Sequence, residues 1–262
     1  MAHENNIKPE ENRPPKEGQA ADKAAEAAPA LLRDEEGRLC LAAGGQTMYG
    51  DFSRLLPRTQ PNNLNGELVV RACRPKKAPV DGRQLTVLDA TAGMGEDSFL
   101  LAAAGFEVTL YERDHTIFLL LEDTLKRAAE NPETAEIAAR MHLIEGDSIE
   151  GMRKMAAGKA SDAAGSTAIP DSSAGIPGRP DIILLDPMFP ERKKSGLVKK
   201  KFQLIHYLEM PCTDEDELLG AARAAYPSRI VIKRPAKGPF LAGQKPSFSL
   251  KGGSIRYDII IL

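Results

Sequence analysis

One stretch, residues 86–113, constrains the fold of this chain more than any other. It opens with an apolar run that reaches Asp89 and then breaks into a turn containing Gly93 and Gly95, which predicts a buried strand followed by a tight loop. A helix is expected next, and a second apolar run at residues 108–111 predicts a second strand. The stretch therefore predicts a βαβ unit with a crevice at the carboxyl ends of its strands.

The residue types around this crevice indicate a nucleoside ligand. Gly93 and Gly95 let backbone N–H groups approach a ligand closely, and Glu112 can accept hydrogen bonds from both hydroxyls of a ribose. Glycine turns of this kind also occur in α/β proteins that bind no nucleotide, so the two glycines alone leave both interpretations open. The carboxylate at the neighbouring strand end makes nucleoside binding the working hypothesis.

The turn differs from a dinucleotide-binding loop in two ways. Ser98 stands where the third glycine of that fingerprint is expected, and Glu96 and Asp97 place two carboxylates in the first turn of the helix. These carboxylates would repel a pyrophosphate, which binds at the positive end of a helix. The pattern argues against a nicotinamide dinucleotide and for a ligand with a cationic group, such as the sulfonium and ammonium of S-adenosylmethionine.

A second motif follows another apolar run and reads Asp-Pro-Met-Phe at residues 186–189. It resembles the (Asp/Asn)-Pro-Pro-aromatic motif of methyltransferases that act on exocyclic amines, with Met188 in place of the second proline. The carboxylate of Asp186 and the carbonyl of Pro187 can accept both hydrogens of such an amine, and Phe189 can stack on the base. An Asp-Pro pair also starts ordinary turns, so the catalytic interpretation depends on its place beside the glycine turn.

Basic residues come soon after this motif and again at the end of a later apolar run. Such cations can hold the phosphates of a nucleic acid, although a charged loop is often only a solvated surface. The residues that we expect to contact RNA are Arg192, Lys193, Lys194, Lys199, Lys200, Lys201, Lys233 and Arg234.

The rest of the chain is consistent with an α/β fold. Residues 229–233 and 255–262 predict terminal strands that pair antiparallel, because a loop of about 20 residues without a helix joins them. We therefore predict a Rossmann-like, mostly parallel seven-stranded sheet with an antiparallel C-terminal strand. Residues 79–262 are expected to form this domain, with a flexible insertion at about 156–180.

The N-terminal part is expected to be an appendage to this domain. Residues 1–30 are rich in alanine, charged residues and proline and are predicted to be disordered, at least in part. Residues 31–78 form a small N-terminal segment, with a strand or hairpin at residues 31–41 and a helix at residues 62–77.

Composition restricts the class of protein. A hydrophobic content of 42% suffices for a core, and the longest apolar runs are far too short for a membrane span. The polar N-terminus does not resemble a secretory signal, so we expect a cytoplasmic protein. The 3 cysteines and 4 histidines are scattered without a metal-binding spacing, so we predict no metal site.

Several segments taken together resemble one family. They are D-A-T-A-G-M-G-E-D, Y-E-R, L-L-D-P-M-F-P followed by K-S-G-L-V-K-K, and V-I-K-R-P, all within residues 64–262. These segments are similar to the RsmJ family, the small-subunit ribosomal RNA guanine-N2 methyltransferases. The resemblance implies a class I methyltransferase fold, S-adenosylmethionine as cofactor, and methyl transfer to the exocyclic N2 amine of a guanine in 16S rRNA of the small ribosomal subunit.

The resemblance also implies a set of site residues. Where the family has a basic residue after the second glycine this chain has Glu96, so a contact there is expected to be mainly through the backbone. Asp147 could accept a hydrogen bond from an adenine amine or cap the helix that follows, and the two roles are compatible. The expected catalytic residues are Asp186, Pro187 and Phe189. With the glycine turn included, the expected cofactor-binding residues are Asp89, Gly93, Gly95, Glu96, Asp97, Glu112, Arg113, Asp147, Ser148 and Asp186.

Other functions remain open at this point. An adenine-N6 or another amine methyltransferase would use the same tetrad, because the chemistry of exocyclic amines is shared. A non-catalytic RNA-binding or ribosome-assembly factor on the same fold is the alternative from a different class, and Glu112 and Asp186 argue against it. A nicotinamide oxidoreductase is disfavoured by the missing third glycine and by the carboxylates after the turn.

Overall fold

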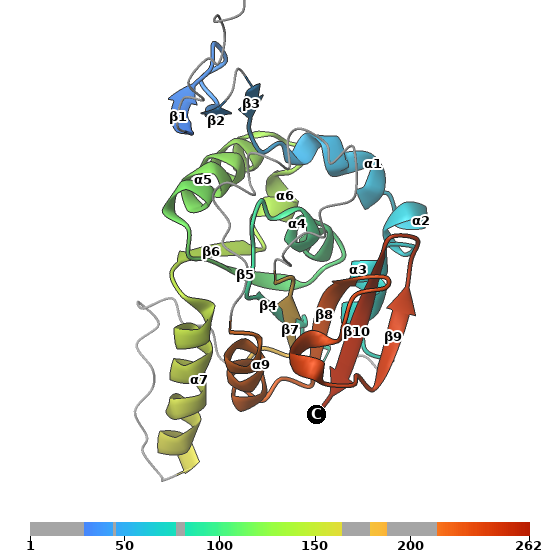
Figure 1. Ribbon diagram of the computed structural model, residues 1–262. Coiled ribbons are helices and arrows are strands. Elements are labelled where there is room, and N and C mark those ends of the chain that lie inside the picture. The colour runs from blue at the N-terminus through green and yellow to red at the C-terminus, as the bar shows by residue number, and fades with distance from the viewer. Residues whose placement is uncertain (1–28, 44–45, 77–81, 164–178, 188–213) are drawn as a thin grey trace, which may run out of the picture.

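The computed structural model describes residues 29–43, 46–76, 82–163, 179–187 and 214–262. Figure 1 shows a central twisted sheet between two layers of helices, with a small three-stranded sheet of the N-terminal segment lying beyond one helical layer. No helix in these ranges is long and apolar enough to cross a membrane.

The central sheet has seven strands in the order β6-β5-β4-β7-β8-β10-β9. Neighbours from β6 to β8 are parallel, whereas β10 is antiparallel to both β8 and β9. The strands are β4 (Thr86–Asp89), β5 (Glu107–Glu112), β6 (Met141–Glu145), β7 (Ile182–Leu185), β8 (Arg229–Pro235), β9 (Phe248–Lys251) and β10 (Ile255–Ile261). The predicted mostly parallel sheet with an antiparallel C-terminal strand is therefore confirmed.

Strand β9 was not expected, because its residues lie in the segment interpreted as the loop between β8 and β10. It forms a hairpin with β10, in which Phe248 pairs with Ile259 and Lys251 pairs with Arg256. A strand of 4 residues at a sheet edge buries too little apolar surface to show a clear alternating pattern in the sequence.

The central strands are apolar because both of their faces are buried. Successive side chains of a strand point to opposite faces, so Val87 and Leu184 pack into one core while Leu88 and Leu185 pack into the other. One core lies under α3 (Leu68–Cys73), α4 (Glu96–Ala103), α5 (His115–Glu130) and α6 (Ala135–Ala138), and the other lies under α7 (Ser148–Ala163) and α9 (Glu215–Ala224). This alternation decides which side chains of β8 face the site described below.

Two helix boundaries differ from the sequence expectation. Instead of one helix at residues 62–77, the chain forms α2 (Pro61–Leu64) and α3, and the turn between them contains Gly66, whose N–H donates to the carbonyl of Asn63 at 2.9 Å. Helix α7 continues to Ala163, within the insertion expected at residues 156–180, because alanine and lysine favour the helix. The rest of that insertion up to residue 178 lies outside the described residues, as do residues 1–28.

The N-terminal segment packs directly on the glycine turn. Its antiparallel strands are β1 (Ala30–Arg33), β2 (Leu39–Ala43) and β3 (Gln46–Met48), which include the predicted hairpin, and they are followed by η1 (Phe52–Leu55) and α1 (Leu56–Thr59). Met48 is buried with Leu120 of α5, and Met94 of the turn packs against them. Phe52 stacks on Phe99 of α4 with ring centroids 4.5 Å apart. The segment therefore supports the loop that connects β4 to α4.

Candidate active site

Four carboxylates gather where the parallel strands end and α4 begins. Asp89 ends β4, Glu112 ends β5, Asp186 follows β7, and Asp97 lies in the first turn of α4. The carboxyl ends of parallel strands lie along one edge of a sheet, which is why residues so distant in the sequence meet here. The structure thus brings together the carboxylates beside which the sequence predicted a ligand crevice.

The glycine turn is tight for two reasons. Gly93 and Gly95 have positive φ angles of 52° and 71°, which other residues rarely adopt. A Cβ atom on Gly95 would also lie 2.9 Å from Cδ1 of Leu121 and 3.3 Å from Cζ of Phe52. Packing of the turn onto the core therefore requires glycine here, independently of any ligand.

Glu112 holds this turn in place. Its Oε2 accepts a hydrogen bond from the N–H of Gly93 at 2.9 Å, and its Oε1 accepts from the N–H of Asp114 at 2.8 Å. Burial raises the pKa of the carboxyl, and these backbone donors oppose that shift. Each carboxylate oxygen has a second lone pair, so Glu112 can still accept from ribose hydroxyls.

Asp89 explains why a serine replaces the third glycine. The side chain of Asp89 is 3% exposed, its Oδ2 accepts from Oγ of Ser98 at 2.6 Å, and its Oδ1 accepts from the N–H of Thr91 at 3.1 Å. Ser98 therefore reaches back from α4 to the end of β4. Burial, which the hydrogen bonds only partly oppose, raises the pKa of Asp89 to about 7.

This raised pKa predicts a pH-dependent stability. Because folded Asp89 binds its proton more tightly than the unfolded carboxyl, whose pKa is about 4, its contribution to the free energy of unfolding falls as pH rises from about 4 to 7. We expect Asp89→Asn to remove a slope of about 1 kcal/mol per pH unit in this window. Urea unfolding of both proteins at pH 5, 6 and 7 measures the difference.

Asp181 provides the control for this prediction. Hydrogen bonds from Arg83 and Thr86 outweigh desolvation and lower its pKa, so its titration lies below the window. Asp181→Asn should lower stability without changing the slope between pH 5 and 7. Equal slopes for the wild type and Asp89→Asn would contradict the assignment to Asp89.

Lys233 lies between two of these carboxylates. Its Nζ is 2.9 Å from Oδ2 of Asp97 and 2.8 Å from Oδ2 of Asp186. The hydroxyl of Tyr257, which pairs with Lys233 across β8 and β10, donates to the same Asp97 oxygen at 3.1 Å. Lys233 follows the buried Val231 by two positions, so strand alternation points it toward α4. The sequence predicted that Lys233 contacts RNA phosphates, whereas in this structure its ammonium contacts two carboxylates.

Arg234, the other residue of β8 that was predicted to contact RNA, is buried. Its side chain is 0% exposed, its Nε donates to the carbonyl of Pro239 at 2.9 Å, and its Nη1 is 3.2 Å from Oε1 of Glu215. Being next to Lys233 in a strand, it points to the opposite face and packs by α9. A buried guanidinium of this kind does not present itself to RNA.

Asp186 is anchored to the loop after β4. Its backbone N–H donates to Oγ1 of Thr91 at 2.6 Å, and Pro187 behind it is buried. Desolvation raises the pKa of Asp186, although 41% of its side chain is exposed, and the Lys233 ammonium opposes this shift. Phe189 and the basic residues from Arg192 to Lys201 lie outside the described residues.

The remaining expected cofactor residues lie along the same edge. Asp147 is exposed and its Oδ1 accepts from the N–H of Ile149 at 2.7 Å, so it caps α7. Ser148 is 8% exposed at the start of that helix. Glu96 and Arg113 are exposed. Capping of α7 by Asp147 agrees with one of the two roles considered for this residue.

Sequence reasoning missed two polar partners of this site. Thr91 lies within the glycine-turn motif but had no assigned role, although a hydroxyl between Asp89 and Gly93 was a usable signal. Tyr257 had no local signal at all, because only the pairing of β10 with β8 brings it to the crevice.

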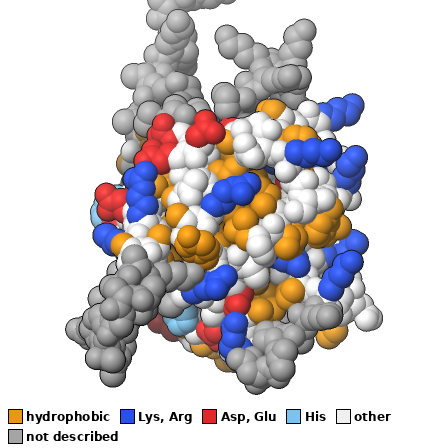
Figure 2. Space-filling model, turned by 90° about the horizontal axis from the view of Figure 1, so that it is seen from below, with side chains coloured by type: hydrophobic (Ala, Val, Ile, Leu, Met, Phe, Trp, Pro, Cys, Tyr) orange, Lys and Arg blue, Asp and Glu red, His pale blue; other side chains and the backbone are white. Residues whose placement is uncertain are grey.

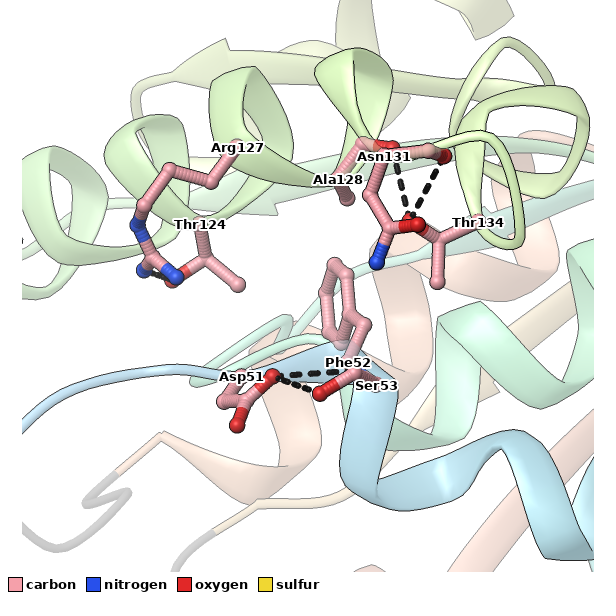
Figure 3. A pocket seen from close by; sticks show the side chains of 8 residues that line it. All are labelled: Asp51, Phe52, Ser53, Thr124, Arg127, Ala128, Asn131 and Thr134. Carbon is pink, nitrogen blue, oxygen red and sulfur yellow. Dashed lines mark hydrogen bonds between the residues drawn. The ribbon is translucent and has the colours of Figure 1, made fainter.

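A separate hollow lies between the N-terminal segment and α5 (Figure 3). Its polar groups serve the local structure: Oδ1 of Asp51 accepts from the N–H and hydroxyl of Ser53, and Oγ1 of Thr134 donates to the carbonyl of Ala128. Arg127 donates to the carbonyl of Gly50 at 2.7 Å. This hollow is therefore a packing contact and does not contain the predicted site residues. Within the described ranges, no group of three or more His, Cys, Asp or Glu residues could hold a metal ion.

Fold and site together define a Rossmann-like methyltransferase. Two features support this class. The antiparallel strand β10 is inserted before the last edge strand, and carboxylates gather at the ends of the parallel strands. The family model described as "Putative SAM-dependent methyltransferase" matches residues 32–262.

More particularly, the chain belongs to the ribosomal RNA small subunit methyltransferase J family. It is 39% identical over 211 residues to the protein of that name from Neisseria gonorrhoeae, covering 80% of this chain and 75% of the relative. The relative from Pseudomonas fluorescens Pf-5 is 44% identical over 195 residues, covering 74% of this chain and 66% of the relative. The relative from Pseudomonas aeruginosa UCBPP-PA14 is 47% identical over 173 residues, and the match spans 66% of this chain and 59% of that protein.

A solved structure agrees with this assignment. The crystal structure of a SAM-dependent methyltransferase from Neisseria gonorrhoeae matches with a TM-score of 0.65 at 31% sequence identity, covering 92% of this chain and 86% of that one.

Proposed function

We propose that this protein transfers a methyl group from S-adenosylmethionine to the exocyclic N2 amine of a guanine in 16S rRNA of the small ribosomal subunit. The observation that carries the proposal is the Asp186 carboxylate, which lies at the end of β7 and shares the Lys233 ammonium with Asp97. A carboxylate able to accept an amine hydrogen thus adjoins a crevice suited to the cofactor.

The residues of the crevice fit S-adenosylmethionine. Asp97 and Glu112 offer carboxylate oxygens to a cationic amino-acid group and to ribose hydroxyls. The N–H groups of Gly93 and Gly95 already donate, to Glu112 and to the carbonyl of Ala92, so the turn contributes its shape and not these two donors. Among the described residues, the Lys233 ammonium is bound by two carboxylates, those of Asp97 and Asp186, and the partly ionised Asp89 lies nearby. The excess of negative charge favours a cationic ligand over a pyrophosphate.

Asp186 and Pro187 perform the chemistry that the protein contributes. When bound, S-adenosylmethionine supplies an electrophilic methyl group on a sulfonium. The Asp186 carboxylate and the Pro187 carbonyl would accept the two N–H hydrogens of the amine, which directs the nitrogen lone pair toward the donor and stabilises the developing positive charge. The hydrogen bond from Asp186 N–H to Thr91 holds this short segment against the crevice.

Ribosomal RNA is favoured as substrate by the relatives, which are named as small-subunit rRNA methyltransferases. The N2 amine of guanine comes from the family resemblance, and an adenine amine would use the same acceptors. Residues 192–201, which we propose as phosphate contacts, lie outside the described ranges. On the face shown in Figure 2, the described basic side chains are spread among apolar ones and form no single patch. An enzyme with this substrate would act in the cytoplasm, where ribosomes assemble.

The proposed function is tested by methyl transfer to small ribosomal subunits from a strain that lacks this protein. Tritiated S-adenosylmethionine supplies the label, and mass spectrometry of the digested rRNA identifies the nucleoside. Label in N2-methylguanosine at one site is the expected result. Label in another nucleoside would correct the substrate, and no label with intact cofactor binding would overturn rRNA as the substrate.

Glu112→Ala is expected to weaken cofactor binding about 10- to 100-fold, because it removes a charged acceptor for the ribose and the partner of the Gly93 N–H. Isothermal titration calorimetry with S-adenosylhomocysteine measures the Kd. Glu122→Ala, at a half-exposed position on α5 outside the crevice, is the matched control and should leave the Kd unchanged. An unchanged Kd in Glu112→Ala would place the ribose elsewhere.

A further inference from the structure

We propose that Lys233 is a positioning residue for methyl transfer, whose ammonium fixes the Asp186 carboxylate beside Asp97 and holds it ready to accept the substrate amine. The inference rests on the proposed function, because it assigns a role within the same site. It replaces the interpretation of Lys233 as a contact for RNA phosphate.

The geometry supports a bridging role. One ammonium lies 2.9 Å from Asp97 at the start of α4 and 2.8 Å from Asp186 after β7, so it links two elements that are adjacent only through tertiary structure. Tyr257 donates to the same Asp97 oxygen and thereby orients that carboxylate from β10. Charge-assisted hydrogen bonds of this length constrain both carboxylates.

The enclosure of Lys233 argues against contact with a phosphate. Its side chain is 25% exposed and that of Asp97 is 21% exposed. A phosphate approaching the ammonium would meet the carboxylates of Asp97 and Asp186, which repel it. A cationic ligand and a neutral amine are the chemical partners that this arrangement accepts.

The electrostatics of the cluster agree with this role. Desolvation disfavours the charged form of Lys233, but Asp186 and Asp97 outweigh it and raise the pKa of the ammonium. Desolvation and then Asp97 raise the pKa of the Tyr257 hydroxyl, so it stays a donor. The other titratable groups that interact through space with Asp97 or Asp186 are Asp89, Arg234, Arg58 and Cys73. Among the described residues, Lys233 is the cation in direct contact with Asp186, so its removal should raise the pKa of that carboxyl.

Three variants test the proposal in the full-length chain. Lys233→Met keeps the length of the side chain and removes its charge, Lys233→Arg restores a cation, and Tyr257→Phe removes only the hydroxyl that orients Asp97. Lys154→Met is the matched control, because Lys154 is 65% exposed on α7 and pairs only with Glu150 at 3.8 Å in the described structure. Its kinetic parameters should equal those of the wild type.

In Lys233→Met, we expect kcat to fall about 10- to 100-fold. The acidic limb of the kcat–pH profile should move upward, because Asp186 must ionise without its neighbouring cation. The KM for small ribosomal subunits and its dependence on salt should stay unchanged, since no phosphate contact is lost. Lys233→Arg should recover part of kcat. Tyr257→Phe should lower kcat less than Lys233→Met does, and it should move the acidic limb of the kcat–pH profile by a smaller amount.

A second measurement separates this proposal from the proposed function. Carbon-13 NMR of labelled aspartate follows the titration of the Asp186 carboxyl in the wild type and in Lys233→Met without any RNA, with Asp186→Asn to assign the signal. A higher pKa in Lys233→Met supports the coupling even if rRNA proves not to be the substrate. An unchanged pKa, or an unchanged kcat with a raised KM and a weaker salt dependence, would overturn the positioning role.

Discussion

Asp186→Ala is expected to lower kcat for methyl transfer by about 10³-fold or more. The variant removes the carboxylate that we propose accepts an amine hydrogen and balances the developing positive charge on the nitrogen. It should leave the fold intact, because the Asp186 side chain is 41% exposed and Lys233 keeps its contact with Asp97. Single-turnover transfer of a tritiated methyl group to small ribosomal subunits measures the loss.

Two further variants define what Asp186 contributes. Asp186→Asn keeps an acceptor oxygen and loses the charge, so it should retain more activity than the alanine variant. Asp216→Ala removes an exposed carboxylate from the first turn of α9 and should leave turnover unchanged. Turnover at the wild-type rate in Asp186→Ala would refute the proposed chemistry.

Arg256→Ala is expected to lower the free energy of unfolding by about 3 to 5 kcal/mol. Arg256 is 5% exposed and Asp258 is 2% exposed, and their charged groups lie 2.9 Å apart within β10. Nη1 of Arg256 also donates to the carbonyls of Pro235, Ala236 and Gly238. The variant therefore leaves a buried carboxylate without its counter-ion and removes the donor that shapes the loop after β8.

Urea unfolding at pH 7 measures this loss, and the m-value shows whether the transition stays two-state. Arg223→Ala, at an exposed position on α9, is the matched control and should change stability by less than about 0.5 kcal/mol. A loss below about 1 kcal/mol in Arg256→Ala would mean that the buried pair contributes little to the fold.

Most of the sheet was predictable because its signals are local. The apolar runs of β4, β5 and β7 and the glycines between β4 and α4 each follow from a few adjacent residues. Their shared sheet edge then follows from the rule that parallel strands end on one side. By contrast, β9 was missed, because a short edge strand is specified by its pairing with β10 and not by its own composition.

The two basic residues near the end of β8 show what a local sequence pattern does not contain. Lys233 and Arg234 are neighbours in one basic motif and received one assignment, yet they point to opposite faces of β8. The pairing of β8 between β7 and β10 decides which face meets α4, and only that pairing separates the two roles.

The sequence by itself determined the class of fold, the glycine turn after β4 and the carboxylates at the strand ends, because each depends on a short pattern of residue types. The tertiary structure decided what those carboxylates contact. Ser98 and Asp89 share a hydrogen bond and are 9 positions apart in the sequence, whereas the hydrogen-bonded Tyr257 and Asp97 are 160 positions apart. Contacts of the second kind depend on strand order and side-chain direction, which no local pattern contains.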